Sequence, residues 1–228
     1  QPYAAWYGQG YNAIKLWEGD LTPEWAYTMH WGLFLFVIAS WMAWETIDWM
    51  AKTPVSALNM VRQHLGYYIA AVVGTVAVII GLLVMKIQPG WIVVLMGVWA
   101  VVLMLRRGQP LAKRAVLFMT GSALALTLAV ELVVLVGDIG RMNTVFKFYL
   151  QAWTLFSLSA AAALMWLWPA VQSVWQDRVR AIWKVALAVL VIGAALYPLM
   201  AGTDKIRDRM SREAPSTLDG MQYMATSK

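Results

Sequence analysis

The residues with the clearest potential for chemistry lie in one stretch, residues 137–154, with the sequence GDIGRMNTVFKFYLQAWT. Its charges and amides interrupt an otherwise apolar chain, and apolar runs flank it at residues 115–136 and 155–168. The first of these runs contains a single carboxylate, Glu131. Ionisable groups inside membrane segments are costly and usually face the helix bundle or a wet cavity, so this stretch is the first candidate for a functional site.

Helical spacing predicts that these polar side chains form two walls. One wall consists of four residues at steps of four, four and three: Asn143, Lys147, Gln151 and Thr154. The other wall consists of three residues of the preceding helix: Thr127, Glu131 and Asp138. Residues at these spacings share one face of a helix. The two walls are therefore expected to meet where the helices are joined.

The types of these residues predict a lipid-phosphate site beside an acid or base. Asn143 is expected to cap the following helix, whose exposed N–H groups and positive dipole end attract anions. Four residues are the predicted phosphate-binding set: Arg141, Asn143, Lys147 and Gln151. Two carboxylates are the catalytic candidates: Glu131 and Asp138. Glu131 and Lys147 are each six residues from the loop, about 9 Å along their helices, so they are expected to face each other.

The alternative interpretation is structural. In it the charges neutralise one another and hold two helices together, because structural ion-pair networks produce the same pattern as functional sites. Spacing alone favours this alternative.

Composition assigns the chain to membrane proteins and excludes several classes of function. The chain has 228 residues, of which 61% are hydrophobic and 13% charged. Several apolar runs approach the length that spans a bilayer. With no cysteine and only two histidines, no metal site or other cofactor is expected. The net charge of +6 lies largely in short loops, where membrane topology explains it, so no nucleic-acid partner is expected.

The apolar runs predict an all-α bundle with about six transmembrane spans. An aromatic interfacial segment (1–25) precedes the bundle (26–200), and a polar tail (201–228) follows it. The expected spans are residues 26–44, 67–85, 91–105, 115–136, 143–168 and 182–200, with Pro169 ending the fifth. Glu45 and Asp48 are expected at a solvated helix end. A small-residue ridge at Gly121, Ala125 and Ala129 predicts close helix packing.

Loop charges predict the orientation of the bundle in a cell membrane. The loops after spans one, three and five hold nine Lys and Arg residues, and the opposite loops hold four. The positive-inside rule then places both termini outside the cytoplasm. Because the chain opens with Gln1 and shows no signal peptide, it is expected to be part of a longer protein or a processed product. His30 is interpreted as an interfacial anchor, with pigment ligation as the alternative.

Four segments resemble the YYY-type integral membrane proteins (Chlor_Arch_YYY) of Chloroflexi and archaea. The central one is RMNTVFKFYLQAW at residues 141–153. The others are YGQGYNAIKLWEGDLTPEWAY at 7–27, GLFLF at 32–36 and STLDGMQYM at 216–224. The family is in turn similar to multi-span glycosyltransferases that take sugars from polyprenyl phosphates and use an acidic residue in an early external loop. The resemblance implies a related scaffold, with Arg141, Asn143 and Lys147 in its central motif. Catalysis by this chain alone is not expected.

Two hypotheses about function follow. In the first, the chain is related to polyprenyl-phosphate-dependent glycosyltransferases, and its charges line a wet, outward-facing cavity. In the second, it is a non-catalytic structural subunit of a larger membrane complex, photosynthetic or respiratory, and the same charges are dry and mutually paired. Membrane lipids are partners in both hypotheses, and other membrane subunits are partners in the second.

Overall fold

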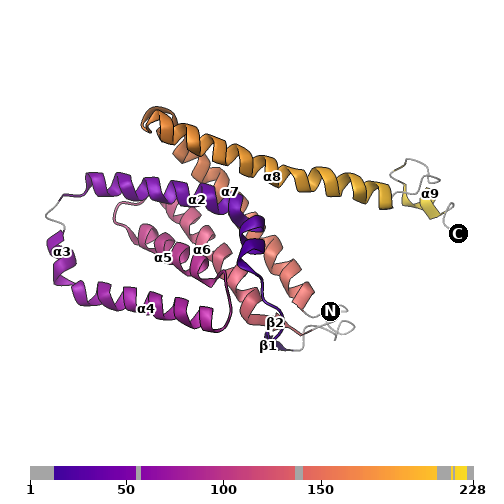
Figure 1. The fold of residues 1–228 in the computed structure, drawn as a ribbon, viewed down its shortest axis with the longest axis horizontal. Coiled ribbons are helices and arrows are strands. Elements are labelled where there is room, and N and C mark those ends of the chain that lie inside the picture. The colour runs from indigo at the N-terminus through magenta and orange to yellow at the C-terminus, as the bar shows by residue number, and fades with distance from the viewer. Residues whose placement is uncertain (1–12, 55–57, 137–140, 210–216, 218, 225–228) are drawn as a thin grey trace, which may run out of the picture. The chain divides into compact units, whose positions relative to one another are not determined.

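The computed structural model of the chain is a helical bundle with one short pair of strands (Figure 1). It describes residues 13–54, 58–136, 141–209, 217 and 219–224. The long helices are α2 (Glu24–Lys52), α4 (Leu65–Val84), α5 (Gly90–Leu105), α6 (Leu111–Leu132), α7 (Arg141–Ser173) and α8 (Asp177–Arg209). Short helices are α3 (Leu58–Gln63) and α9 (Gly220–Met224).

Five of these helices are long and apolar enough to cross a membrane: α2, α4, α6, α7 and α8. The shorter α5, with 16 residues, is also apolar. The prediction of an all-α membrane bundle is therefore confirmed, and each expected span has a helix at its place.

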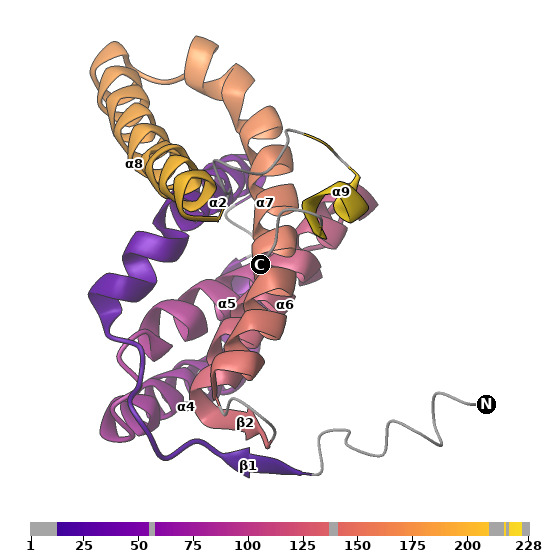
Figure 2. The ribbon, with the colours of Figure 1, turned by 90° about the vertical axis from the view of Figure 1, so that its right-hand side faces the viewer.

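The chain forms two compact units, Gln1–Gln176 and Asp177–Lys228. In the first unit α6 is the central helix and packs against both α5 and α7 (Figure 2). Helix α2 lies along α7, and α4 packs on α5. Much of the surface of α4 is apolar and exposed, as expected of a helix that faces lipid. The second unit consists of α8 and the short α9.

Aromatic side chains fill the contact between α2 and α7. Trp31 is fully buried, and its ring lies 5.3 Å from that of Phe156. Further along, the rings of Trp41 and Trp166 are also 5.3 Å apart. Tilted and edge-on ring pairs of this kind add to the stabilisation that burial of their surface provides. The regular aromatic positions of both helices thus fix the register in which α2 lies against α7.

A pair of strands joins the N-terminal segment to the end of α6. Strand β1 (Ile14–Leu16) pairs antiparallel with β2 (Val133–Leu135), with Lys15 opposite Val134. Residues 133–135 were expected to continue the fourth span, and that boundary is wrong. Two consecutive β-branched residues, Val133 and Val134, favour the extended backbone that the pairing with β1 then holds.

Two other sequence expectations differ from the structure. Pro169 does not end the fifth span, because α7 continues through it to Ser173. A proline this close to a helix end removes few backbone hydrogen bonds, so the helix tolerates it. The expected small-residue ridge is not tightly packed, since a Cβ on Gly121 would meet nothing within 4 Å.

Candidate functional site

The candidate site lies where α6 ends and α7 begins. Glu131 is the second-last residue of α6 and Arg141 the first of α7. The β1–β2 pair brings the loop of residues 17–23 over this point, and the backbone N–H of Trp17 donates to the carbonyl of Leu132 at 2.9 Å. Three segments that are distant in the sequence therefore meet at one buried carboxylate.

Glu131 is held by three donors. Its side chain is almost completely buried, and the residue is 2% exposed. Oε2 accepts from the backbone N–H of Thr22 at 2.9 Å, and Oε1 accepts from the Thr22 hydroxyl at 2.6 Å. Oε1 also pairs with Nη2 of Arg141 at 2.6 Å. Charge-assisted bonds of this kind offset the large cost of burying a carboxylate.

Arg141 binds the same loop from the other side. Its Nη1 donates to the carbonyl of Asp20, and its Nε donates to the carbonyl of Val130 at 3.2 Å. Its guanidinium lies 5.2 Å from the ring centroid of Trp17, within the range of a cation–π interaction. Glu131 and Arg141, together with the loop residues Trp17, Asp20 and Thr22, are here called the Glu131 cluster. The cluster fastens the loop to α6 and α7.

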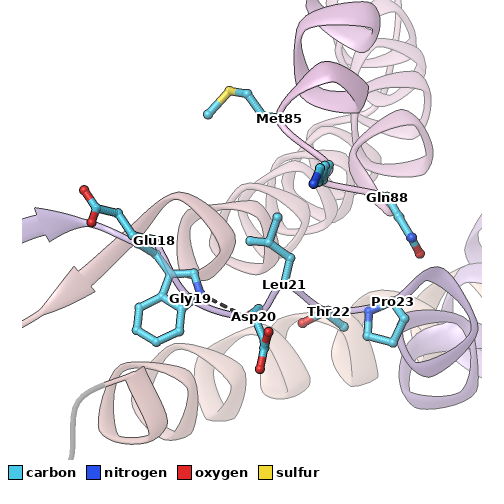
Figure 3. A pocket seen from close by; sticks show the side chains of 10 residues that line it. Glu18, Gly19, Asp20, Leu21, Thr22, Pro23, Met85 and Gln88 are labelled. Atoms are coloured by element: carbon cyan, nitrogen blue, oxygen red, sulfur yellow. Dashed lines mark hydrogen bonds between the residues drawn. The ribbon is translucent and has the colours of Figure 1, made fainter.

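A hollow of about 580 Å³ opens beside the Glu131 cluster (Figure 3). One wall is the loop of residues 17–23, and the other is the turn between α4 and α5, with Met85, Lys86 and Gln88. The turn is tied to the start of α2 because Gln88 Oε1 accepts from the backbone N–H of Glu24 at 3.0 Å. We call this feature the loop hollow.

The charged residues that line the loop hollow are Glu18, Asp20 and Lys86. Both acidic residues are exposed. Asp20 contributes to the Glu131 cluster through its backbone carbonyl, which accepts from Trp17 Nε1 and from Arg141 Nη1. The loop hollow thus combines two acids with one cation at the end of the apolar helices.

The structure brings together two of the predicted site residues, Glu131 and Arg141, as an ion pair. The cation beside Glu131 is therefore Arg141, and the expectation that Lys147 faces it is wrong. Arg141 is the first residue of α7, and its long side chain extends back to Glu131 at the end of α6. Lys147 lies six residues further along α7 and is exposed.

The other predicted site residues lie elsewhere on α7 or outside the residues that the structure describes. Asn143 is the third residue of α7 rather than its cap, because the helix already begins at Arg141. Gln151 is exposed on the same helix. Asp138 lies outside the described residues. The catalytic and phosphate-binding roles assigned to these residues stay predictions.

A second buried carboxylate, Glu45, was missed by the sequence analysis. It is 4% exposed and pairs with Lys113 and, at 3.8 Å, with Arg106. The expectation of a solvated position is wrong for Glu45, because it faces α5 and α6. The expectation of a solvated position fits Asp48 better, since Asp48 pairs with the exposed Lys52 at 2.8 Å. The burial of Glu45 could have been predicted from its position four residues after Trp41, which places both side chains on the same face of α2.

Below the Glu131 cluster, the hydroxyls of Tyr27 and Thr127 lie 3.0 Å apart, and both residues are 1% exposed. His30 is exposed, and its ring contacts those of Trp31 and Tyr149. Within the described part of the chain, no three His, Cys, Asp or Glu residues form a group that could hold a metal ion.

Fold and site together define a polytopic helical membrane protein with charged clusters at its helix ends. The chain belongs to the family described as uncharacterized membrane protein (DUF2298), whose profile matches residues 1–156. That match includes the Glu131 cluster and the loop hollow. No curated protein and no solved structure matches the chain.

Proposed function

We propose that this membrane protein binds the phosphorylated head group of a membrane lipid in the loop hollow, with polyprenyl-phosphate sugars as the lipid class. The observation that carries the proposal is the combination of Glu18, Asp20 and Lys86 around a space of about 580 Å³. The resemblance to polyprenyl-phosphate-dependent glycosyltransferases, which use an acidic residue in an external loop, supports this choice of ligand. The acidic loop is residues 17–23.

The charges of the loop hollow suit a sugar phosphate. Lys86 supplies a point charge for the phosphate, while carboxylates accept hydrogen bonds from sugar hydroxyls. A hollow at the end of apolar helices also lets the isoprenoid chain remain in the hydrocarbon layer while the head group enters polar surroundings.

In this proposal Glu131 and Arg141 are positioning residues. The Arg141 guanidinium donates to the carbonyls of Val130 and Asp20, to the hydroxyl of Thr22 and to the carboxylate of Glu131. The role first expected of Arg141, direct phosphate binding, passes to Lys86. The buried pair instead determines where the loop presents its two carboxylates.

A sugar transfer in this site would use one carboxylate of the loop as a general base. The carboxylate of Glu18 or Asp20 takes the proton of the acceptor hydroxyl, whose oxygen bonds to the anomeric carbon. The bond from that carbon to the phosphate oxygen breaks, and the electron pair leaves with the polyprenyl phosphate. Lys86 stabilises the negative charge of this leaving group.

Binding of undecaprenyl phosphate to the purified chain, measured by native mass spectrometry, tests the proposal. Lys86→Gln is expected to weaken the complex about tenfold, because it removes the one cation of the hollow. Lys86 has a φ of 63°, and glutamine is a close match in size, so the fold should persist. The matched control is Lys15→Gln, a change of an exposed lysine on β1 outside this hollow. Equal binding by wild type and Lys86→Gln would contradict the proposal.

A second candidate, the structural subunit, is supported by the low exposure of the Glu131–Arg141 pair, with side chains 1% and 15% exposed. Such a pair is what this hypothesis expects of charges that only hold helices together. Purification of the natural protein in mild detergent tests it. The subunit hypothesis requires a larger assembly of fixed composition and fails if the protein migrates alone.

A further inference from the structure

The opposite end of the first unit carries a dense group of cations at the connection between α5 and α6. We call this group the basic turn and define it by its members: Arg106, Arg107, Lys113 and Arg114. The chain reverses direction here at Gly108, whose φ of +76° is readily adopted by glycine. Two cations on this connection and two in the first turn of α6 therefore lie at one end of two neighbouring helices.

Only part of this charge is neutralised by the protein. Glu45 pairs with Lys113 and with Arg106, whose side chains are 24% and 15% exposed. Arg107 and Arg114 are exposed, and among the described residues no carboxylate forms an ion pair with either of them. The Nη2 of Arg114 donates to the carbonyl of Arg106 at 3.2 Å, which holds this arginine against the turn.

The side-chain amide of Gln109, in the same turn, is buried without a hydrogen-bond partner in the described part of the chain. The residue is 5% exposed, and neither atom of its amide group has a hydrogen-bond partner within the described part of the chain. A buried amide without partners is costly, and such groups usually meet a ligand or water. The amide offers both a donor and an acceptor on the connection that carries Arg106 and Arg107.

Tryptophans place the basic turn at the depth of lipid head groups. The guanidinium of Arg106 lies 5.8 Å from the ring of Trp49, and the ammonium of Lys113 lies 5.8 Å from that of Trp166. Indole rings beside cations at the end of membrane helices are typical of the boundary between hydrocarbon and water. A ligand at the basic turn would therefore be a lipid whose chains lie along α5 and α6.

We propose that the basic turn is a binding site for an anionic phospholipid, with Arg107 and Arg114 at the phosphate and Gln109 at the glycerol or ester oxygens. Arginine forms paired hydrogen bonds with phosphate, and the surplus of positive charge selects anionic over zwitterionic head groups. The carboxylate of Glu45 orients Arg106 and Lys113, so it organises the site without binding the ligand. This site is separate from the loop hollow and does not depend on its proposed function.

The probe is an equimolar mixture of phosphatidylglycerol and phosphatidylcholine, presented to the purified full chain and analysed by native mass spectrometry. Wild type is expected to retain phosphatidylglycerol preferentially. The double variant Arg107→Gln/Arg114→Gln should lower that preference about tenfold or more, because each surface arginine contributes several-fold to anionic-lipid binding. Lys52→Gln is the matched control, since Lys52 is an exposed cation at the end of α2 and already pairs with Asp48.

Three outcomes would overturn the proposal. Wild type could retain both lipids equally, or the double variant could keep the wild-type preference. Alternatively, millimolar inorganic phosphate could displace phosphatidylglycerol while phosphatidylcholine stays bound, which would assign the turn to soluble phosphate. Circular dichroism of each variant shows whether the bundle is intact, and Gln109→Leu gives a further check. If the buried amide binds the lipid, this variant also loses preference for phosphatidylglycerol.

Discussion

The Glu131–Arg141 ion pair joins α6 to α7 and holds the loop of residues 17–23 through Thr22 and the carbonyl of Asp20. Both charges are largely removed from water, so each depends on the other for compensation. Removal of one partner leaves an uncompensated charge, whereas removal of both leaves none. Substitutions of Glu131 and of Arg141 should therefore be strongly coupled in their effects on the free energy of unfolding.

We predict that Glu131→Gln and Arg141→Met each destabilise the protein by about 3 kcal/mol, and that the double variant loses much less than the sum. The measurement is unfolding in detergent for the four members of this double-mutant cycle. The parallel cycle of Glu131→Gln with Lys147→Met should be close to additive, because Glu131 pairs with Arg141 instead. Additivity in the first cycle would show that the ion pair does not form.

Two carboxylates three residues apart near the end of α2 should differ sharply in their contribution to the stability of the protein. Glu45 is buried between two cations, whereas Asp48 pairs within its own helix with Lys52, whose side chain is 74% exposed. Glu45→Gln is therefore expected to cost about 3 kcal/mol, and Asp48→Asn about 0.5 kcal/mol or less. Thermal unfolding of the two variants under identical conditions checks this, and equal losses would contradict the assigned geometry.

Helices α2 and α6 each carry polar side chains near both ends of a largely apolar buried face. On α6 this face includes Lys113 and Glu131, which are 18 residues and thus five turns apart. On α2, Tyr27 and Glu45 are also 18 residues apart. Tyr27 contacts Thr127 of α6, and Glu45 contacts Lys113 of α6, so the two faces meet at both ends.

The threonines on this face of α6 are predicted to respond oppositely to the same substitution. The hydroxyl of Thr127 bonds to Tyr27 and to the carbonyl of Leu124 at 2.8 Å, so Thr127→Val should cost about 1 kcal/mol or more. The hydroxyl of Thr120 is fully buried, with no hydrogen-bond partner in the described part of the chain. Thr120→Val should accordingly raise the stability by about 1 kcal/mol.

Thermal unfolding of both valine variants distinguishes these outcomes. Destabilisation by Thr120→Val would mean that its hydroxyl binds a group inside the bundle, and would contradict the assignment of a buried hydroxyl without a hydrogen-bond partner in the described part of the chain.

The helices were predictable from the sequence because lipid-facing apolar runs are long and continuous. The helix boundaries were less predictable. Residues 133–135 are as apolar as the helix before them, and only their pairing with Ile14–Leu16 makes them a strand. Glu131 was identified because a lone carboxylate stands out in an apolar run. Its bond to Thr22 was not predicted, because Thr22 is more than a hundred residues away and its approach depends on that same strand pair.

At the scale of the whole molecule, the order of apolar helices determines which connections share a side of the membrane. Three long apolar helices, α6, α7 and α8, separate the basic turn from residue 219. The basic turn is expected on the cytoplasmic side, since it is the densest group of cations between spans. Both termini are then expected on the opposite side.

Single cysteines test this orientation cleanly because the natural chain contains none. Leu111→Cys, at a position 82% exposed, should resist an impermeant thiol reagent added to intact cells, and Asp219→Cys should react. Permeabilised cells provide the control in which both cysteines react. Labelling of both from the outside, or of Leu111→Cys alone, would contradict the predicted topology.

We propose that the loop of residues 17–23, fastened by Glu131 and Arg141, forms one wall of a site for a phosphorylated lipid. Amide hydrogen exchange of this loop in detergent, with and without undecaprenyl phosphate, tests this proposal. The lipid is expected to slow exchange in residues 17–23 and 85–88 of wild type, and Lys86→Gln is expected largely to abolish the effect. Exchange that the lipid leaves unchanged in wild type, or slows equally in Lys86→Gln, would contradict it.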